Sequence, residues 1–329
     1  MSSELNRSAC PSDILTAIGE ATKVLVISHF SPDSDAYGSS CALTGALEKM
    51  GKQAVCLNES GILRSLQFVP GVENVVSKLP KEDFDLVLVL DCGDEKRVGD
   101  TLTDFIRKHP KVVNIDHHAS NTLFGDLNWV VSDACSTSEL IFDLLCDLGF
   151  EFTPDVAEAL LIGIYGDTGS FRNLSTSARS FEIAAKLVAH GANPAKIAAK
   201  MYESLSPSSF RMRAFLLSQA EFRAEGRVVI SIASAQDYRA YGATSEDTEG
   251  VVEELRSIGG VRVSCFIREV DGIWRVSLRS KDPKLDVSKV AAQFGGGGHV
   301  VAAAFRFRES IEKLTSALYP VLDSLVGEN

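Results

Sequence analysis

The chain has 329 residues, of which 45% are hydrophobic and 23% are charged, and its formal net charge at pH 7 is −11. This length allows two domains, each with its own core. The net negative charge argues against a binding surface for long nucleic acids, which needs many Lys and Arg contacts to phosphate. It permits a short phosphorylated substrate in one pocket, where bound cations would offset the charge of nearby carboxylates.

The first part of the chain alternates strand-like and helix-like segments. Apolar, β-branched runs predict strands at 24–29, 53–58, 85–91, 111–116 and, at a sheet edge, 128–131. Helical spacing predicts helices over 36–50, 62–68, 101–108, 137–148, 155–170 and 177–190. The alternation predicts an α/β domain over residues 1–190, built on a doubly wound, mostly parallel sheet.

The pattern changes towards the C-terminus. Residues 191–225 contain glycine, two prolines and a helical segment, which predicts a helical linker. Beyond it, strands are expected at 227–233, 261–268 and 273–279, with helices at 246–257, 286–293 and 308–325. Residues 226–329 are therefore predicted to form a smaller α+β domain.

Features of membrane or secreted proteins are missing from the sequence. No apolar stretch approaches the roughly 18 to 20 residues that span a bilayer, and the N-terminal segment lacks the apolar core of a signal peptide. The seven cysteines are never spaced as Cys-x-x-Cys, which favours reduced thiols over a disulfide or zinc framework. We therefore expect a cytoplasmic protein that makes no membrane contact.

Three apolar strands each end on side chains that commonly bind metals. The first leads into His29, with Asp33 and Asp35 close behind; the second stops at Asp91; the third ends on the triplet Asp116-His117-His118. Open α/β sheets place their chemistry at the carboxyl ends of such strands, so these side chains should share one cleft. Mixed Asp and His ligands suit Mn²⁺, Fe²⁺ or Zn²⁺, and the carboxylate majority also tolerates Mg²⁺.

Two aspartates allow more than one interpretation. Asp91 is well placed to bridge two metals about 3.5–4 Å apart, a recurring device for phosphate-ester hydrolysis, but it could instead cap the next segment. Asp167 follows a mostly apolar helix, where a cation would offset its burial; an N-cap or a turn formed by residues 167–170 is the alternative. Within the triplet, one imidazole should bind metal and the other face phosphate, with Asp116 orienting a ligating ring.

A run of four glycines, Gly295 to Gly298, precedes His299. Glycine lets backbone N–H groups approach an anion closely, and His299 and Arg279 could add charge-assisted hydrogen bonds. The alternatives are a flexible turn for the glycine run and a solvated surface for Arg279-Ser280.

Together these segments resemble the DHH phosphoesterase superfamily, which is named for the triplet at 116–118. Residues 29–39 match its first motif, Asp91 its second and residues 166–171 its fourth, while Arg279-Ser280 and the glycine run resemble its DHH-associated C-terminal domain. The length and the C-terminal domain are most similar to the nanoRNase (NrnA-type) group. Those enzymes are oligoribonucleases that also remove the 3′-phosphate of 3′-phosphoadenosine 5′-phosphate (pAp).

The resemblance implies a role for each matching residue. The implied ligands of two Mn²⁺ ions are His29 and Asp33 for one, Asp35, His117 and Asp167 for the other, and Asp91 as the bridge. The implied catalytic residues are His118, Asp116 and Asp91. The implied substrate-binding residues are His118, Arg279, Ser280, Gly296, Gly297, Gly298 and His299. The family usually has glycine where this chain has Ala304, so the added methyl group is expected to tighten the substrate pocket.

The resemblance implies hydrolysis of short oligoribonucleotides to nucleoside 5′-monophosphates, of pAp to AMP, or of both, by a metal-bridging hydroxide. Alternative substrates are the linear dinucleotide derived from cyclic di-AMP, single-stranded DNA as for a RecJ-type exonuclease, and pyrophosphate. A nucleotide-binding regulator is the non-enzymatic alternative, but such a protein should lack a metal ligand, and every expected position is filled. Short RNA or small nucleotides are the expected partners rather than long duplexes, and a homodimer is compatible with the sequence.

Overall fold

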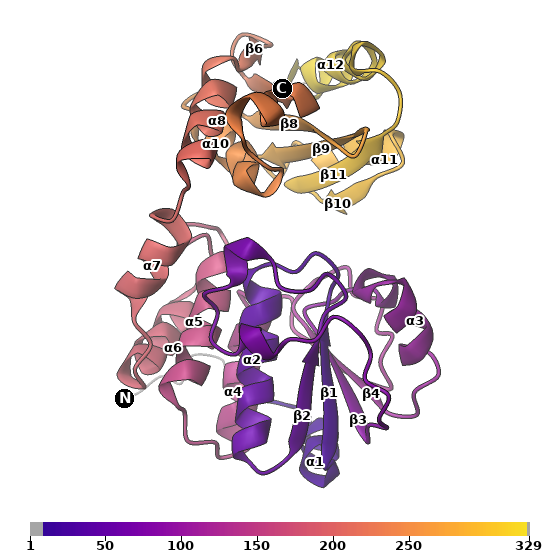
Figure 1. The fold of residues 1–329 in the computed structure, drawn as a ribbon, viewed down its shortest axis with the longest axis vertical. Coiled ribbons are helices and arrows are strands. Elements are labelled where there is room, and N and C mark those ends of the chain that lie inside the picture. Colours follow the sequence, from indigo (N-terminus) through magenta and orange to yellow (C-terminus); the bar gives the residue numbers. More distant parts are fainter. Residues whose placement is uncertain (1–8, 328–329) are drawn as a thin grey trace. The chain divides into compact units, whose positions relative to one another are not determined.

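The structure is a computed structural model that describes residues 9–327. The chain divides into two compact units, one that runs up to Glu203 and one that begins at Ser204 (Figure 1). The division falls inside the segment predicted as a linker, whereas the functional limits at residues 190 and 226 remain a prediction. Among the described residues, no helix is both long and apolar enough to cross a membrane.

The N-terminal unit is built on a five-stranded parallel sheet with the strand order β2-β1-β3-β4-β5; Figure 1 labels β1 to β4. Its strands are β1 (Lys23–Ser28), β2 (Gln53–Leu57), β3 (Leu86–Leu90), β4 (Val112–Asp116) and β5 (Leu127–Val130). Every residue of β3 and β4 is buried, as expected for central strands that are covered on both faces. The predicted parallel α/β sheet is confirmed.

Helices cover both faces of this sheet. They are α1 (Ser12–Glu20), α2 (Ser34–Lys49), α3 (Asp100–Ile106), α4 (Thr137–Asp147), α5 (Pro154–Asp167), α6 (Ala178–Ala189) and α7 (Pro194–Tyr202). Alternate strand residues face opposite sides: Val24, Val26 and Leu88 join the core with α2, α4 and α5. Leu25 and Val89 join a smaller core with α3. The sheet is therefore doubly wound.

The C-terminal unit contains a mixed six-stranded sheet with the order β10-β11-β9-β8-β7-β6. Its strands are β6 (Glu221–Arg223), β7 (Val228–Ala233), β8 (Val263–Val270), β9 (Ile273–Ser280), β10 (Gly297–His299) and β11 (Ala302–Phe307). Its helices are α8 (Pro207–Ser218), α9 (Ala235–Tyr241), α10 (Val251–Ser257), α11 (Val287–Gln293) and α12 (Ile311–Gly327). One face packs on α11 and α12, and part of the other packs on α8, α9 and α10.

Several local predictions differ from the structure. The segment 62–68 forms only the short 3₁₀ helix η1 (Arg64–Leu66); the other 3₁₀ turns are η2 (Val72–Asn74), η3 (Glu95–Val98) and η4 (Glu246–Thr248). The predicted linker contains two helices, α7 and α8, and strand β6. The glycine run is not a loop throughout, because Gly297 to His299 pair with β11 as an antiparallel edge strand. Glycine and alanine have low strand propensity, so this pairing depends on tertiary contacts.

Helices α2 and α5 approach each other closely at Gly38. A Cβ atom at this position would lie 2.7 Å from the carbonyl oxygen of Ala159 and 2.8 Å from the nitrogen of Gly163. Both atoms belong to the α5 backbone and cannot rotate away. Glycine is therefore required at position 38, because the backbones of α2 and α5 approach too closely to leave room for a side chain.

We expect Gly38→Ala to destabilise the protein by about 1–3 kcal/mol, the usual cost of overpacking. Gly45→Ala is the matched control in the same helix, because its Cβ would have no neighbour closer than 3.8 Å and alanine favours helix. Thermal unfolding followed by circular dichroism measures both. Equal midpoints for the two variants would contradict the close helix contact.

Candidate metal centre

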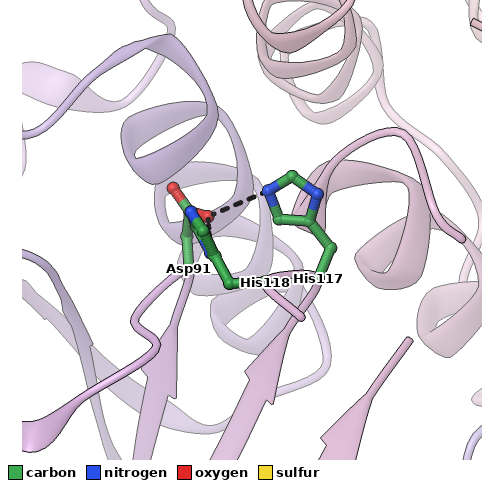
Figure 2. Close-up of side chains that lie close together, drawn as sticks. All are labelled: Asp91, His117 and His118. Atoms are coloured by element: carbon green, nitrogen blue, oxygen red, sulfur yellow. Dashed lines mark ion pairs between the residues drawn. The ribbon is translucent and has the colours of Figure 1, made fainter. Parts of the chain in front are cut away.

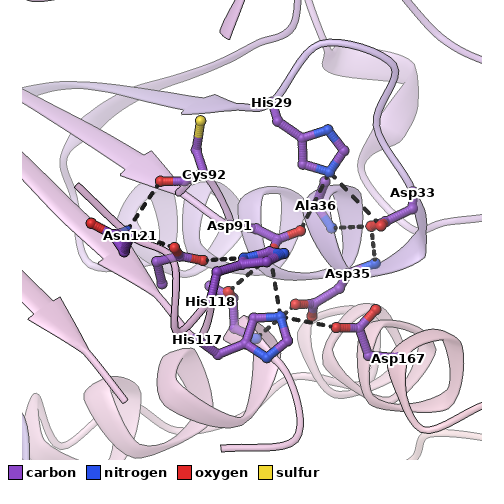
Figure 3. A network of polar contacts seen from close by, with 12 residues as sticks. His29, Asp33, Asp35, Ala36, Asp91, Cys92, His117, His118, Asn121 and Asp167 are labelled. Carbon is purple, nitrogen blue, oxygen red and sulfur yellow. Dashed lines mark hydrogen bonds and ion pairs between the residues drawn. The ribbon is translucent and has the colours of Figure 1, made fainter. Parts of the chain in front are cut away.

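All six side chains predicted as metal ligands lie at the carboxyl edge of the parallel sheet, and Figure 3 shows them gathered around one space. Three follow strands directly or almost directly: His29 comes after β1, Asp91 after β3 and His117 after β4. The other three lie on helices, with Asp33 as the N-cap of α2, Asp35 in its first turn and Asp167 as the last residue of α5. The fold thus brings together segments more than a hundred residues apart.

Asp91 lies at the centre of the group. The residue is only 1% exposed, and its backbone has a φ of 53°, a left-handed conformation uncommon outside glycine and often found at functional sites. Oδ2 lies 3.5 Å from Nε2 of His29, whereas Oδ1 lies 3.6 Å from Nε2 of His117 and 3.7 Å from Nδ1 of His118 (Figure 2). The two carboxylate oxygens therefore face different imidazoles.

The ligand atoms form two groups of metal-binding size on either side of Asp91. His29, Asp33 and Asp91 make the first group, and Asp35, His117 and Asp167 make the second; within each group the ligand atoms lie within 4.8 Å of one another. In the second group, Nε2 of His117 approaches Oδ2 of Asp167 to 3.1 Å. A third group, Asp91 with both triplet histidines, joins the two. Each of these groups could hold a metal ion, and Asp91 is a member of two of the three.

The electrostatics of the site fit divalent cations. Burial and the charges of Asp91 and Asp167 hold the pKa of Asp35 well above its usual range. Burial, with Asp33 and Asp91, raises the pKa of Asp167 to about 6 despite the nearby His117. Nε2 of His117 is buried and lies 3.1 Å from Oδ2 of Asp167, but without the geometry of a hydrogen bond. A bound cation would offset the charge of these carboxylates and accept the lone pair of this nitrogen.

The N-terminus of α4 fixes the carboxylate of Asp35. The backbone N–H of Thr137 donates to Oδ2 at 2.6 Å, and that of Ser138 donates to Oδ1 at 2.9 Å. The Thr137 hydroxyl also donates to Oδ1 of Asp91 at 3.2 Å. A helix N-terminus favours a negative charge, so α4 positions two of the predicted ligands. The sequence motifs do not indicate this role, although Ser136 and Glu139 form the S-x-x-E pattern that marks a helix start.

Asp116 orients His118 rather than the predicted ligand His117. Its Oδ1 lies 2.7 Å from Nδ1 of His118, and its Oδ2 accepts a hydrogen bond of 2.6 Å from the Asn121 side chain. The Asn121 amide also donates to Oδ1 of the buried Asn114 at 2.8 Å. With Nδ1 turned towards Asp116, Nε2 is at the opposite edge of the His118 ring. Asn121 is a second supporting residue that the sequence motifs did not reveal.

Apart from His118, the predicted substrate-binding residues lie in the C-terminal unit. Arg279 pairs with Glu253 at 2.8 Å, and Ser280 is buried, with its hydroxyl donating to the carbonyl of Asp282 at 2.8 Å. Gly296 is required by packing, since a Cβ there would lie 2.3 Å from the carbonyl oxygen of Ala304. At Gly297 a Cβ would meet nothing within 4 Å, so the backbone of this residue is open on that side.

Comparisons with known proteins place these observations in a family. The model of the DHH family, N-terminal domain, matches residues 23–164, and that of the DHHA1 domain matches residues 226–326. The chain is 34% identical over 282 residues to the bifunctional oligoribonuclease and PAP phosphatase NrnA of Thermus thermophilus, covering 85% of this chain and 82% of that protein. The chain belongs to the DHH family. The Bacillus subtilis NrnA is 27% identical over 299 residues, covering 88% of this chain and 91% of that protein.

Solved structures agree with this DHH-family fold. An exopolyphosphatase-related protein from Bacteroides fragilis has 26% identity and a TM-score of 0.91, covering 98% of this chain and all of that chain. RecJ of Thermus thermophilus, in complex with Mn²⁺, has 14% identity and a TM-score of 0.58, covering 96% of this chain and 54% of that chain. At this identity the RecJ match supports the fold alone.

Proton release on metal binding offers a test of the site. Burial opposes protonation of His29 and His117, but the surrounding carboxylates outweigh it and raise the pKa of each imidazole to about 10. At pH 8 both rings should therefore be protonated in the metal-free protein, and metal binding must displace those protons. We expect about two protons to be released from the two rings.

Titration calorimetry with Mn²⁺ in two buffers of different ionisation enthalpy counts these protons. Because the folded-state pKa values lie near 10, the release should fade as pH rises through 10. A binding enthalpy independent of the buffer at pH 8 would contradict histidine ligation.

Proposed function

We propose that this DHH-family enzyme hydrolyses short oligoribonucleotides to nucleoside 5′-monophosphates and pAp to AMP. The observation that carries the proposal is the pair of Asp/His groups, one with His29 and one with His117, that a third group of Asp91 and the two triplet histidines joins, in a chain 34% identical to an NrnA that performs both reactions. Both reactions hydrolyse a phosphoester bond. Paired metal sites are a recurring means of doing so, and mixed Asp and His ligands suit Mn²⁺.

The proposed ligands are His29 and Asp33 for one cation and Asp35, His117 and Asp167 for the other, with Asp91 shared. Bound cations would supply positive charge to the phosphate oxygens and make a water molecule more acidic. The protein contributes orientation: the α4 amides hold Asp35 in place, and Thr137 holds Asp91. His118, fixed through Nδ1 by Asp116, is proposed to present Nε2 to the scissile phosphate.

The C-terminal unit is proposed to bind a second phosphate of the substrate. Arg279, Ser280, His299 and the backbone from Gly296 to Gly298 are the proposed contacts. Residues 1–190 would then form the catalytic domain, 191–225 the linker and 226–329 the substrate-binding domain. Ala304 is exposed and lies opposite Gly297 in the β10–β11 pairing, so its methyl group borders the proposed site but leaves the backbone of Gly297 open.

A second substrate is supported by other relatives. The chain is 26% identical over 332 residues to the cyclic-di-AMP phosphodiesterase PdeA of Listeria monocytogenes, but it covers only 48% of that protein. The linear dinucleotide derived from cyclic di-AMP is therefore the alternative substrate. The candidate substrates can be ranked by measuring their turnover with Mn²⁺. The panel contains pAp, this dinucleotide, pyrophosphate and oligomers of two to five nucleotides. Tight binding without turnover of any of them would favour a regulator.

Loss of the shared ligand should abolish the reaction. We expect Asp91→Asn to lower kcat/KM for pAp and for a dinucleotide by at least about a hundredfold, since losing even an outer partner of a ligand often costs 10- to 100-fold. Asparagine tolerates the left-handed backbone, so the fold should persist. Asp133→Asn, at an exposed aspartate of the same unit, is the control. Unimpaired turnover by Asp91→Asn would refute the assignment.

The glycine strand can be tested with adjacent alanines. Gly297→Ala should leave the melting temperature unchanged and raise KM for pAp about tenfold, the loss expected for one charge-assisted hydrogen bond. Gly296→Ala should instead lower the melting temperature, because its Cβ would meet Ala304 and Phe305, each at 2.3 Å. An unchanged KM for folded Gly297→Ala would remove this strand from the substrate site.

A further inference from the structure

Three arginines stand side by side across the C-terminal sheet. Arg275 on β9 is directly opposite Arg268 on β8 and, on its other side, directly opposite Arg306 on β11. Directly opposed like charges destabilise a sheet, and this chain is acidic overall, with a net charge of −11. We call Arg268, Arg275 and Arg306 the arginine row. A bound anion would offset the repulsion between these positive charges.

The arginine row lies on the sheet face opposite to the core that packs on α11 and α12. The alternating neighbours Val276, Ile267 and Phe305 are buried in that core, so the arginines extend from the other face. Helices α8, α9 and α10 cover the β7 and β8 part of this second face. Over β11 the face is open, because Arg306 and Ala304 are both exposed.

The protein itself neutralises the row only in part. Arg268 pairs with Glu249 at 2.7 Å, yet its Nε is buried and has no hydrogen-bond partner in the described part of the chain. For Arg275 and Arg306, the structure shows neither an ion pair nor a hydrogen bond to any residue from 9 to 327. Burial and the two flanking arginines also lower the pKa of Arg275. Two guanidinium groups thus remain available to a ligand.

The row shares its sheet face with the proposed phosphate contact. Arg275, Ser277 and Arg279 alternate along β9 and therefore point to the same side. Arg275 and Arg279 are four residues apart, about 13 Å along an extended strand. Two phosphates on a single ribose cannot span that distance, whereas several linked nucleotides can.

We propose that Arg275 and Arg306, with Arg268, bind the phosphodiester backbone of oligonucleotides longer than two residues. The row extends the phosphate contact proposed at Arg279. It gives longer RNA additional binding contacts that pAp is too short to reach. This inference rests on the proposed function, because it takes the substrate to be an oligonucleotide. Because the proposed contacts are to phosphate groups, they do not discriminate between base sequences.

The test is binding of a fluorescent pentaribonucleotide to the full chain, with divalent ions chelated so that the RNA stays intact. In Arg275→Gln/Arg306→Gln, the ratio of pentanucleotide affinity to pAp affinity should fall about tenfold or more. The slope of log affinity against log salt should fall by about 1.4 for the two lost phosphate contacts. Arg239→Gln, at an exposed arginine on α9, removes one charge elsewhere in the unit and should change neither quantity.

Stability separates binding from a structural role. Removing opposed like charges should leave the melting temperature of the double variant unchanged or raise it, whereas a structural role predicts a fall. An unchanged affinity ratio overturns the inference. That result is expected if the arginine row binds an acidic partner protein instead of RNA. Failure of the wild type to hydrolyse pAp or any oligomer overturns the proposed function, while the binding comparison still decides the role of the row.

Discussion

Negative charge held out of water at one edge of a parallel sheet is the constraint on which the site depends. Asp35 and Asp91 are fully or almost fully buried, and Asp167 stands near both. Isolated buried carboxylates are costly, and the raised pKa values of Asp35 and Asp167 express that cost in the metal-free protein. Two imidazoles compensate in part by holding protons. Cations in their place would offset the charge more completely, which couples metal binding to proton release.

The surrounding structure serves to hold these carboxylates in place. The first amides of α4 fix both oxygens of Asp35, and a left-handed backbone turns Asp91 into the site. Gly163 gives the carboxylate room, because a Cβ there would lie 2.7 Å from Oδ1 of Asp35. Gly38 lets α5 approach α2. The fold and the chemistry are therefore linked, since the same close helix contact brings Asp35 and Asp167 to one place.

The sequence predicted much of this arrangement, and the failures have physical causes. Apolar runs that end on Asp or His located the strand ends and the candidate ligands, because parallel strands align their carboxyl ends. Thr137 and Asn121 were missed because they donate hydrogen bonds to the candidate ligands and to Asp116 rather than binding metal themselves, and no ligand pattern marks such donors. The strand at 297–299 was missed because its pairing with β11 comes from long-range packing rather than local propensity. Opposed arginines are far apart in sequence, so the row required the strand register.

The central claim is that Asp91 is shared by two cations. Electron paramagnetic resonance of the protein loaded with two equivalents of Mn²⁺ tests it most directly, because ions that share a ligand at about 3.5–4 Å are magnetically coupled. We predict that the six-line signal of isolated Mn²⁺ is replaced by a coupled spectrum and that Asp91→Asn restores the isolated signal. Two uncoupled six-line signals in the wild type would contradict the shared site.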